Sequence, residues 1–214
     1  MAQPIAIDEA GKWTSNFAPA YWAHWVLKST RRKALVEWYC KVFGARPSFE
    51  NRQLSFLTWD MEHHRLAIIQ MPGIFVLLRG LQRISRKFFG LDHQSFNFGS
   101  LANLLHTYER LRELGIKPVW CTNHGPTTSI YYEDPDGNRL EFQIENFDTV
   151  AELQAFGQSG AFKKNPIGVN FDPDYLLERL RAGVSETVLK QQGSGTRPGT
   201  KEISGYKSLT WRTL

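Results

Sequence analysis

The chain has 214 residues, of which 42% are hydrophobic and 13% aromatic. This composition excludes extensive disorder and allows one domain, or two small fused modules, to bury a core. The formal net charge is +5, but the excess of Lys and Arg lies in a basic segment at 79–87 and near the C-terminus, without a recognised nucleic-acid-binding motif. We therefore expect no nucleic-acid partner.

The two cysteines and the N-terminus bear on the compartment. Cys40 and Cys121 lie in segments expected to be helix and strand, which indicates reduced interior thiols rather than a disulfide framework. The first residues show no basic region followed by an apolar run, and no later stretch reaches about 18 uncharged apolar residues. We expect a soluble, unprocessed, cytoplasmic protein without stable membrane association.

The first half of the chain predicts a strand, a helix and three more strands. Residues 21–28 are aromatic and branched enough for a strand. Ser29 or Thr30 then caps a helix that runs to about Phe43, and Gly44 ends it. Three short strands are expected at 46–51, 53–59 and 64–70.

The second half repeats this order. A strand at 91–98 precedes a helix at 101–114, and the later strands are expected at 117–121, 127–133 and, after the turn Asp134–Gly137, 138–144. The order βαβββ thus occurs twice. We predict an α+β fold of two βαβββ modules, 19–71 and 90–147, whose curved mixed sheets form a shared cleft.

The segments outside the modules have different characters. Residues 72–89 place Leu77, Leu81, Ile84 and Phe88 on one helical face, which predicts a lid or, as we favour, a surface helix that packs on the domain or on a second subunit. Residues 1–18 are an N-terminal extension. Residues 148–190 are a helical extension, with helices expected at 150–156 and from Asp172-Pro173 to about Ala182. Residues 191–214 are rich in Gly, Ser, Thr and Lys and predict a flexible tail.

Three residues from separate strands are candidate metal ligands. Because side chains alternate along a strand, His24, His93 and Glu141 are expected on the concave face, opposite to the apolar residues that the helices cover. Two imidazoles and one carboxylate form the facial triad that holds Fe(II) with open coordination positions. Taken singly, each also has an ordinary structural explanation, as a packed histidine or as part of a solvated strand face.

A stretch in the second module adds further residues in a characteristic order. Residues 122–141, TNHGPTTSIYYEDPDGNRLE, contain His124, Ile130-Tyr131, Asp134-Pro135, Gly137 and Glu141. With these residues the chain from about 21 to 147 resembles the vicinal oxygen chelate superfamily and, within it, the one-domain type I extradiol ring-cleaving dioxygenases. The resemblance implies a shared metal-binding cleft in which His24, His93 and Glu141 are the ligands.

The resemblance also implies an outer set of catalytic residues. His64, in the motif His63-His64-Arg65-Leu66-Ala67, matches an acid-base histidine, and His124 and Tyr131 match a second histidine and a tyrosine. Two departures concern the shorter spacing between His124 and Tyr131 than in many two-domain members, and the longer, more basic region before His93.

The function implied is that of an Fe(II)-dependent extradiol dioxygenase acting on a catechol or fused aromatic diol and O2. Mn(II) accepts the same ligands. Tyr131 is expected to donate a hydrogen bond to a substrate oxygen, and His64 to act as general base or acid. A homo-oligomer is expected, since edge strands of such units often pair. The residues expected to bind substrate are Trp22, Trp25, Asn97 and Arg139.

Two other functions on the same fold stay open. One is a metal-dependent isomerase or lyase of the glyoxalase type, and the other is a metal-free resistance protein that binds an aromatic ligand. Neither calls for His64, His124 and Tyr131 together.

Overall fold

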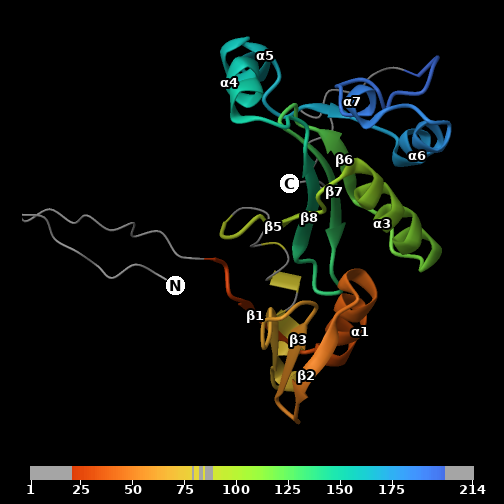
Figure 1. Cartoon of the computed structure of the whole chain (residues 1–214). Coiled ribbons are helices and arrows are strands. Elements are labelled where there is room, and N and C mark those ends of the chain that lie inside the picture. Colours follow the sequence, from red (N-terminus) through yellow and green to blue (C-terminus); the bar gives the residue numbers. More distant parts are fainter. Residues whose placement is uncertain (1–20, 79, 82–83, 85–88, 201–214) are drawn as a thin grey trace, which may run out of the picture.

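Two modules of one design form the body of the molecule. The computed structural model describes residues 21–78, 80–81, 84 and 89–200. The first module, at the bottom of Figure 1, consists of β1 (Trp25–Ser29), α1 (Arg32–Phe43), β2 (Arg46–Glu50), β3 (Leu54–Thr58) and β4 (Leu66–Gln70). Its sheet has the order β1-β4-β3-β2, with β1 parallel to β4 and the other neighbours antiparallel.

The second module repeats the arrangement. It consists of β5 (His93–Asn97), α3 (Leu101–Glu113), β6 (Trp120–Asn123), β7 (Thr127–Glu133) and β8 (Arg139–Glu145). The sheet order is β5-β8-β7-β6, and a two-residue strand β9 (Val169–Asn170) adds to the β6 edge. The predicted α+β fold of two βαβββ modules is confirmed.

The C-terminal helices form two groups. α4 (Val150–Gln158) and α5 (Ala161–Lys164) project from the body in Figure 1, whereas α6 (Pro173–Arg181) and α7 (Glu186–Leu189) lie beside α3. Asp172 caps α6 by accepting hydrogen bonds from the next backbone N–H groups, and Pro173 occupies the first turn, as the sequence predicts.

Aromatic side chains join the cores of the two modules. Phe43 at the end of α1 packs against Phe96 of β5 and Phe142 of β8, with ring centroids 4.8 and 5.4 Å apart. Trp25 of β1 lies 5.6 Å from Phe96. Because Phe43 and Phe96 pack against one buried cluster that contains Trp25 and Phe142, the modules share a core and hold each other in place.

A buried carboxylate adds a polar connection between the modules. Asp134, 4% exposed, lies in the turn between β7 and β8 and accepts hydrogen bonds from the backbone N–H groups of Asp136 and Asn138 at 2.8 and 2.9 Å. It also accepts one from the hydroxyl of Tyr39 in α1, at 3.1 Å. The same carboxylate therefore shapes the β7–β8 turn and ties it to the first module.

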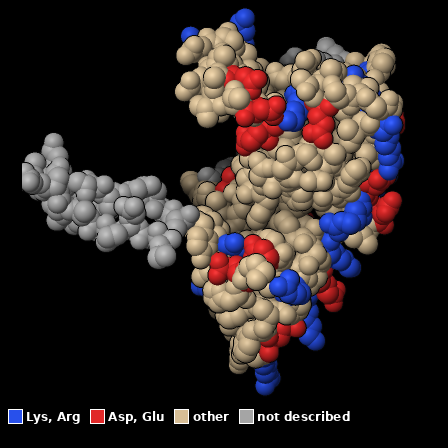
Figure 2. All heavy atoms as spheres, in the orientation of Figure 1, with Lys and Arg blue, Asp and Glu red and all other residues tan. Residues whose placement is uncertain are grey.

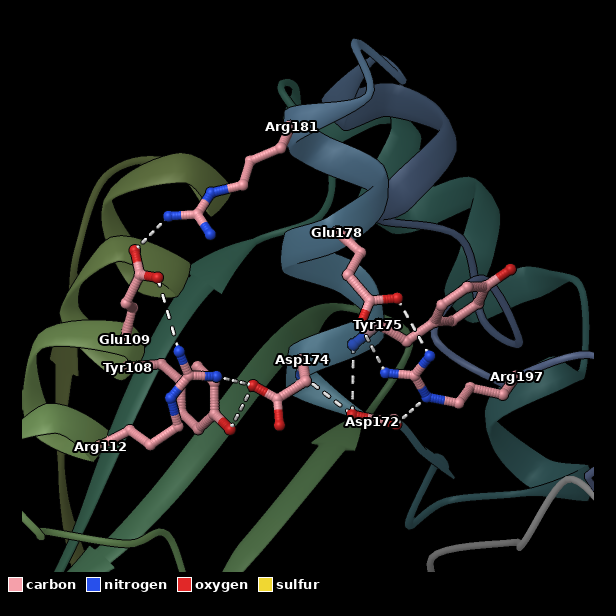
Figure 3. A network of polar contacts seen from close by, with 9 residues as sticks. All are labelled: Tyr108, Glu109, Arg112, Asp172, Asp174, Tyr175, Glu178, Arg181 and Arg197. Atoms are coloured by element: carbon pink, nitrogen blue, oxygen red, sulfur yellow. Dashed lines mark hydrogen bonds and ion pairs between the residues drawn. The ribbon is translucent and has the colours of Figure 1, made fainter.

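Charged side chains fasten the C-terminal helices to α3 (Figure 3). Asp174 of α6 accepts from Tyr108 and pairs with Arg112, while Arg181 pairs with Glu109. Beyond α7, Arg197 binds Asp172 and Glu178 of the α6 region.

The last described residues differ from the sequence-based expectation. Residues 191–200 belong to the segment expected to be flexible, yet the carbonyl of Gly195 accepts from the backbone N–H of Asp172 at 2.9 Å, and Arg197 pairs with two acidic residues. Specific polar contacts thus order this stretch despite its composition. Residues 201–214 lie outside the described part of the chain, as do residues 1–20.

The starts of β1 and α1 also differ from expectation, for local reasons. The first strand begins at Trp25 rather than at residue 21, because the guanidinium of Arg65 occupies the carbonyls of Trp22 and Ala23 at 2.6 and 3.0 Å. α1 begins at Arg32, one or two residues later than expected, because the hydroxyl of Ser29 accepts from the N–H of Arg31 and does not cap the helix. Its predicted end at Gly44, which has the left-handed φ of 63°, is confirmed.

The expected helix at 72–89 is only partly described. Residues Gly73–Leu78 form a short 3-10 helix, η1, and the side chains of Leu77 and Leu81 are 84% and 65% exposed. Phe88 and all four basic residues of this segment lie outside the described residues. On the face shown in Figure 2, Lys and Arg side chains alternate with Asp and Glu. Within the described ranges, no helix has the length and apolar character needed to cross a membrane.

Replacing Asp134 tests the connection between the modules. Asp134→Ala leaves several buried donors without an acceptor and should lower the free energy of unfolding by about 2–4 kcal/mol. Tyr39→Phe removes one hydrogen bond and keeps the turn, so it should cost only about 1 kcal/mol. Urea unfolding of both variants measures the difference; equal stability of Asp134→Ala and the parent chain would contradict the assignment.

Candidate functional site

A buried carboxylate on an inner strand of the second module organises the candidate site. Glu141 of β8 is 6% exposed and stands opposite Ser95 of β5 and Tyr131 of β7 in the strand register. The hydroxyl of Tyr131 donates to Oε1 of Glu141 at 2.7 Å, and Nε2 of His93 lies 3.1 Å from Oε2. The three side chains come from three neighbouring strands, so the sheet itself fixes their spacing.

The charges of this group stabilise one another. Burial alone would raise the pKa of Glu141, but hydrogen bonds, first of all from His93, lower it to about 2. Behind His93, Oδ2 of Asp92 lies 2.6 Å from Nδ1. Hydrogen bonds to Asp92 and then to Glu141 raise the pKa of His93 to about 9. In the structure His93 is thus held between two carboxylates.

His124 extends the group on the other side of Tyr131. Its Nε2 lies 3.0 Å from the Tyr131 hydroxyl and 3.8 Å from Oε1 of Glu141. The indole of Trp120 stacks on Tyr131, with ring centroids 4.8 Å apart, and meets His124 edge-on. Burial lowers the pKa of His124, which favours the neutral imidazole, and raises the pKa of Tyr131, which favours the protonated phenol.

The predicted residues of the first module form a second group. The rings of His24 and His64 have centroids 4.4 Å apart, and Phe56 stacks on His64 at 4.2 Å. His64 is 7% exposed, and its Nδ1 is buried without a hydrogen-bond partner among the described residues. Burial, followed by the neighbouring charges of His63 and His24, lowers the pKa of His64.

A pocket lies between the first strands of the two modules. It has a volume of about 500 Å³, and indole rings and the His93 imidazole share its lining. The predicted substrate-binding residues Trp22 and Trp25 both line it, together with Trp59. A pocket with flat aromatic walls beside a histidine suits a planar apolar ligand.

The other two predicted substrate-binding residues have partners within the protein. Oδ1 of Asn97 accepts from the N–H of Gly99 at 2.7 Å, in the turn before α3. The guanidinium of Arg139 lies 3.8 Å from Asp92 and 3.7 Å from Glu133. Arg139 therefore contacts the carboxylate that supports His93.

The donor set fits a metal ion in part. Two ligands about 2.1 Å from one ion and at right angles stand about 3 Å apart, which matches the 3.1 Å between His93 Nε2 and Glu141 Oε2. His24 lies beside His64 instead. Across residues 21–200, gaps excepted, no three His, Cys, Asp or Glu side chains are grouped so as to hold one ion. The structure thus brings two of the three predicted ligands together.

Sequence reasoning missed three contributors to the site. Asp92 supports His93, and its position directly before that histidine was an available signal. Trp120 packs on Tyr131 and stands opposite it in the register of β6 and β7. The expected strand at 117–121 was misplaced, since β6 covers 120–123, and this pairing could be predicted only from the correct bounds. The carbonyl of Ile167 lies 2.5 Å from Nδ1 of His124, and a backbone group leaves no signal in the sequence.

The contacts of His93 with Asp92 and Glu141 predict a pH dependence for the metal-free chain. Because the pKa of His93 is raised from 6.5 to about 9, its ionised form stabilises the fold fully below about pH 6.5, and this contribution is lost as the pH rises through 9. Glu141→Gln should therefore reduce the loss of stability between pH 6 and pH 9, measured by urea unfolding after chelation. Glu145→Gln, on the same strand but exposed, is the control; an equal loss in both variants would refute the pairing.

Comparisons with known proteins show the family of this chain. Residues 23–142 match the profile of the Glyoxalase/Bleomycin resistance protein/Dioxygenase superfamily. Two relatives from Rhodococcus globerulus are biphenyl-2,3-diol 1,2-dioxygenase 2, 40% identical over 75% of this chain and 82% of its own, and biphenyl-2,3-diol 1,2-dioxygenase 3, 41% identical over 78% and 85%.

Among solved structures, a glyoxalase/bleomycin resistance protein/dioxygenase domain from Frankia sp. matches with a TM-score of 0.47 at 18% identity, over 62% of this chain and 96% of its own. The fosfomycin resistance protein FosX from Mesorhizobium loti matches with a TM-score of 0.45, also at 18% identity, over 64% and 99%. From the profile match and the two relatives it follows that this chain belongs to the glyoxalase/bleomycin resistance/dioxygenase superfamily, as its sequence predicted.

Proposed function

We propose that this protein is an Fe(II)-dependent extradiol dioxygenase that opens the ring of a catechol-type aromatic diol with O2. The enzyme class follows from the two relatives, at 40% and 41% identity over most of both chains. Their names place the diol at carbons 2 and 3 and the oxygenation at carbons 1 and 2, beside the diol rather than within it. The observation that carries the proposal is the contact of Glu141 with both His93 and Tyr131.

The metal ligands in this proposal are His93, Glu141 and His24. The first two have the spacing of neighbouring ligands on one ion. His24 lies between Trp22 and Trp25 in the sequence, and both indoles share the lining of one pocket with His93, which supports His24 as the third ligand. Ferrous iron, when bound, supplies open positions at which a diol and O2 meet, and manganese accepts the same ligands.

The outer residues would move and hold protons. His64 is buried, and its lowered pKa favours a neutral imidazole that can accept a proton from a substrate hydroxyl. Tyr131, whose pKa burial raises, keeps its proton and can donate a hydrogen bond to a substrate oxygen. His124 lies within hydrogen-bond distance of that phenol and can take up or return its proton.

The pocket between β1 and β5 would hold the aromatic part of the substrate, with Trp22 and Trp25 as walls. Asn97 and Arg139 are engaged within the protein, so we propose that they act through the turn before α3 and through Asp92. The reaction would take place in the cytoplasm, in keeping with the two free cysteines. We also propose that the protein forms a homo-oligomer.

Ferrous iron and a set of diols test the activity. Metal-free protein that is loaded anaerobically with Fe(II) and then exposed to air should take up O2 and turn catechol or a biphenyl-type diol into a yellow ring-opened product. His24→Ala, His93→Ala and Glu141→Gln should each lose bound iron and activity, while His106→Gln, on the exposed face of α3, should keep both. Iron binding without O2 uptake would favour an isomerase or lyase, and failure to bind any metal would favour a ligand-binding protein.

The acid-base role of His64 can be tested against its neighbour. His64→Gln removes the proposed base and should lower kcat by about 10²–10⁴-fold, with bound iron unchanged. His63→Gln alters an exposed side chain that pairs with Glu62 and should leave kcat within about twofold of the parent. Steady-state kinetics on iron-loaded protein distinguishes the two, and similar kcat values for both variants would exclude the role.

A further inference from the structure

The C-terminal extension reaches the candidate site through its main chain. β9 pairs with β6 in antiparallel register, with Val169 opposite Asn123 and Asn170 opposite Thr122. His124 directly follows β6, which ends at Asn123. Just before β9, the carbonyl oxygen of Ile167 lies 2.5 Å from Nδ1 of His124. The short strand thus aligns one backbone carbonyl with one imidazole nitrogen.

Glycine at position 168 makes this approach sterically allowed. Gly168 has a φ of +104°, and a Cβ there would overlap the carbonyl oxygen of Asn123 and lie 2.7 Å from Cα of His124. Side chains are therefore excluded at this position by both space and backbone conformation. The turn is also closed on itself, since Asn165 accepts from the N–H of Gly168 at 3.0 Å and donates to its carbonyl at 2.8 Å.

The extension grips the same strand at a second point. Nδ2 of Asn123 donates to the carbonyl of Lys190 at 2.7 Å, and Nε2 of Gln192 donates to the carbonyl of Asn123 at 3.0 Å. Residues before β9 and after α7 thus fix the strand end that carries His124. A helix that only covered the sheet would not need these contacts, because they are directional hydrogen bonds to Asn123 and His124.

We propose that the C-terminal extension positions His124 for catalysis: the carbonyl of Ile167 holds the proton of Nδ1, so that Nε2 faces Tyr131 as a hydrogen-bond acceptor. A neutral imidazole has one donor nitrogen and one acceptor nitrogen, and a carbonyl only accepts. The contact at 2.5 Å therefore selects the tautomer.

The tautomer decides what the Tyr131 hydroxyl can do. Its single hydrogen has two acceptors within reach, Oε1 of Glu141 at 2.7 Å and Nε2 of His124 at 3.0 Å. With the opposite tautomer, Nε2 would donate to Tyr131, and the phenol hydrogen would be confined to Glu141. The role in catalysis rests on the function proposed above, whereas the tautomer itself does not.

Nitrogen-15 NMR of the imidazoles tests the tautomer in the metal-free chain at pH 8. The His124 signals, identified by their loss in His124→Gln, should show a protonated Nδ1 and an unprotonated Nε2. Gly168→Ala displaces the Ile167 carbonyl and should shift this population towards protonated Nε2. Gly183→Ala is the matched control, because Gly183 also has a positive φ, of +83°, but a Cβ there meets nothing within 4 Å.

Kinetics of the iron-loaded enzyme then tests the catalytic consequence. Gly168→Ala should lower kcat about 10-fold or more with little change in KM, whereas Gly183→Ala should not. Should Gly168→Ala fail to fold, Asn165→Ala serves in its place, and Asn165→Asp, which keeps the acceptor for the Gly168 N–H, should restore part of the loss. A protonated Nε2 in the parent chain would overturn the proposal, as would an unchanged tautomer in the variants. Inactivity of the parent chain with a protonated Nδ1 would count against the proposed function alone.

Discussion

The structure of the site depends on the burial of one carboxylate. Glu141 lies on an inner strand of the sheet and is 6% exposed, and an ionised carboxylate in such a place requires donors from its surroundings. They come from both neighbouring strands, as His93 from β5 and Tyr131 from β7. A slip of one residue in β8 would turn the Glu141 side chain into the core and would turn Leu140 and Phe142 out of it. The same register that builds the core therefore builds the site.

The two modules contribute different groups of side chains to the candidate site. The second module carries the charged group around Glu141, whereas the first carries the paired rings of His24 and His64. Two features fix the position of one module relative to the other. The ring of Phe43 packs against Phe96 and Phe142, and the buried Asp134 accepts a hydrogen bond from the first module. The pocket between β1 and β5 lies at this junction, so packing changes there would alter the relation between His24 and His93.

The sequence predicts the fold and part of the site, and the reasons for its failures are local. The strand at 127–133 is readable from its aromatic and β-branched residues. The position of Glu141 is readable because side chains alternate along a strand, so that it lies opposite the apolar face marked by Leu140 and Phe142. The start of β1 is not, since the Arg65 side chain replaces strand pairing with hydrogen bonds to two carbonyls. The order of residues 191–200 is also hidden, because a Gly- and Ser-rich composition gives no sign of the contacts that Gln192 and Arg197 make.

The similarity to known proteins extends into the C-terminal extension. The superfamily profile ends at residue 142, before β9 and the helices that follow it. The match to the second Rhodococcus dioxygenase covers 167 residues of this chain, and wherever such a stretch begins, it reaches residue 167 or beyond. The likeness to ring-cleaving dioxygenases thus includes part of the extension, which the shared fold alone does not require. A segment that only shielded the sheet would need apolar burial, yet Gly168 and Asn165 act here through backbone geometry and hydrogen bonds directed at the strand that carries His124. These features fit a segment whose position relative to one imidazole matters more than the surface it covers.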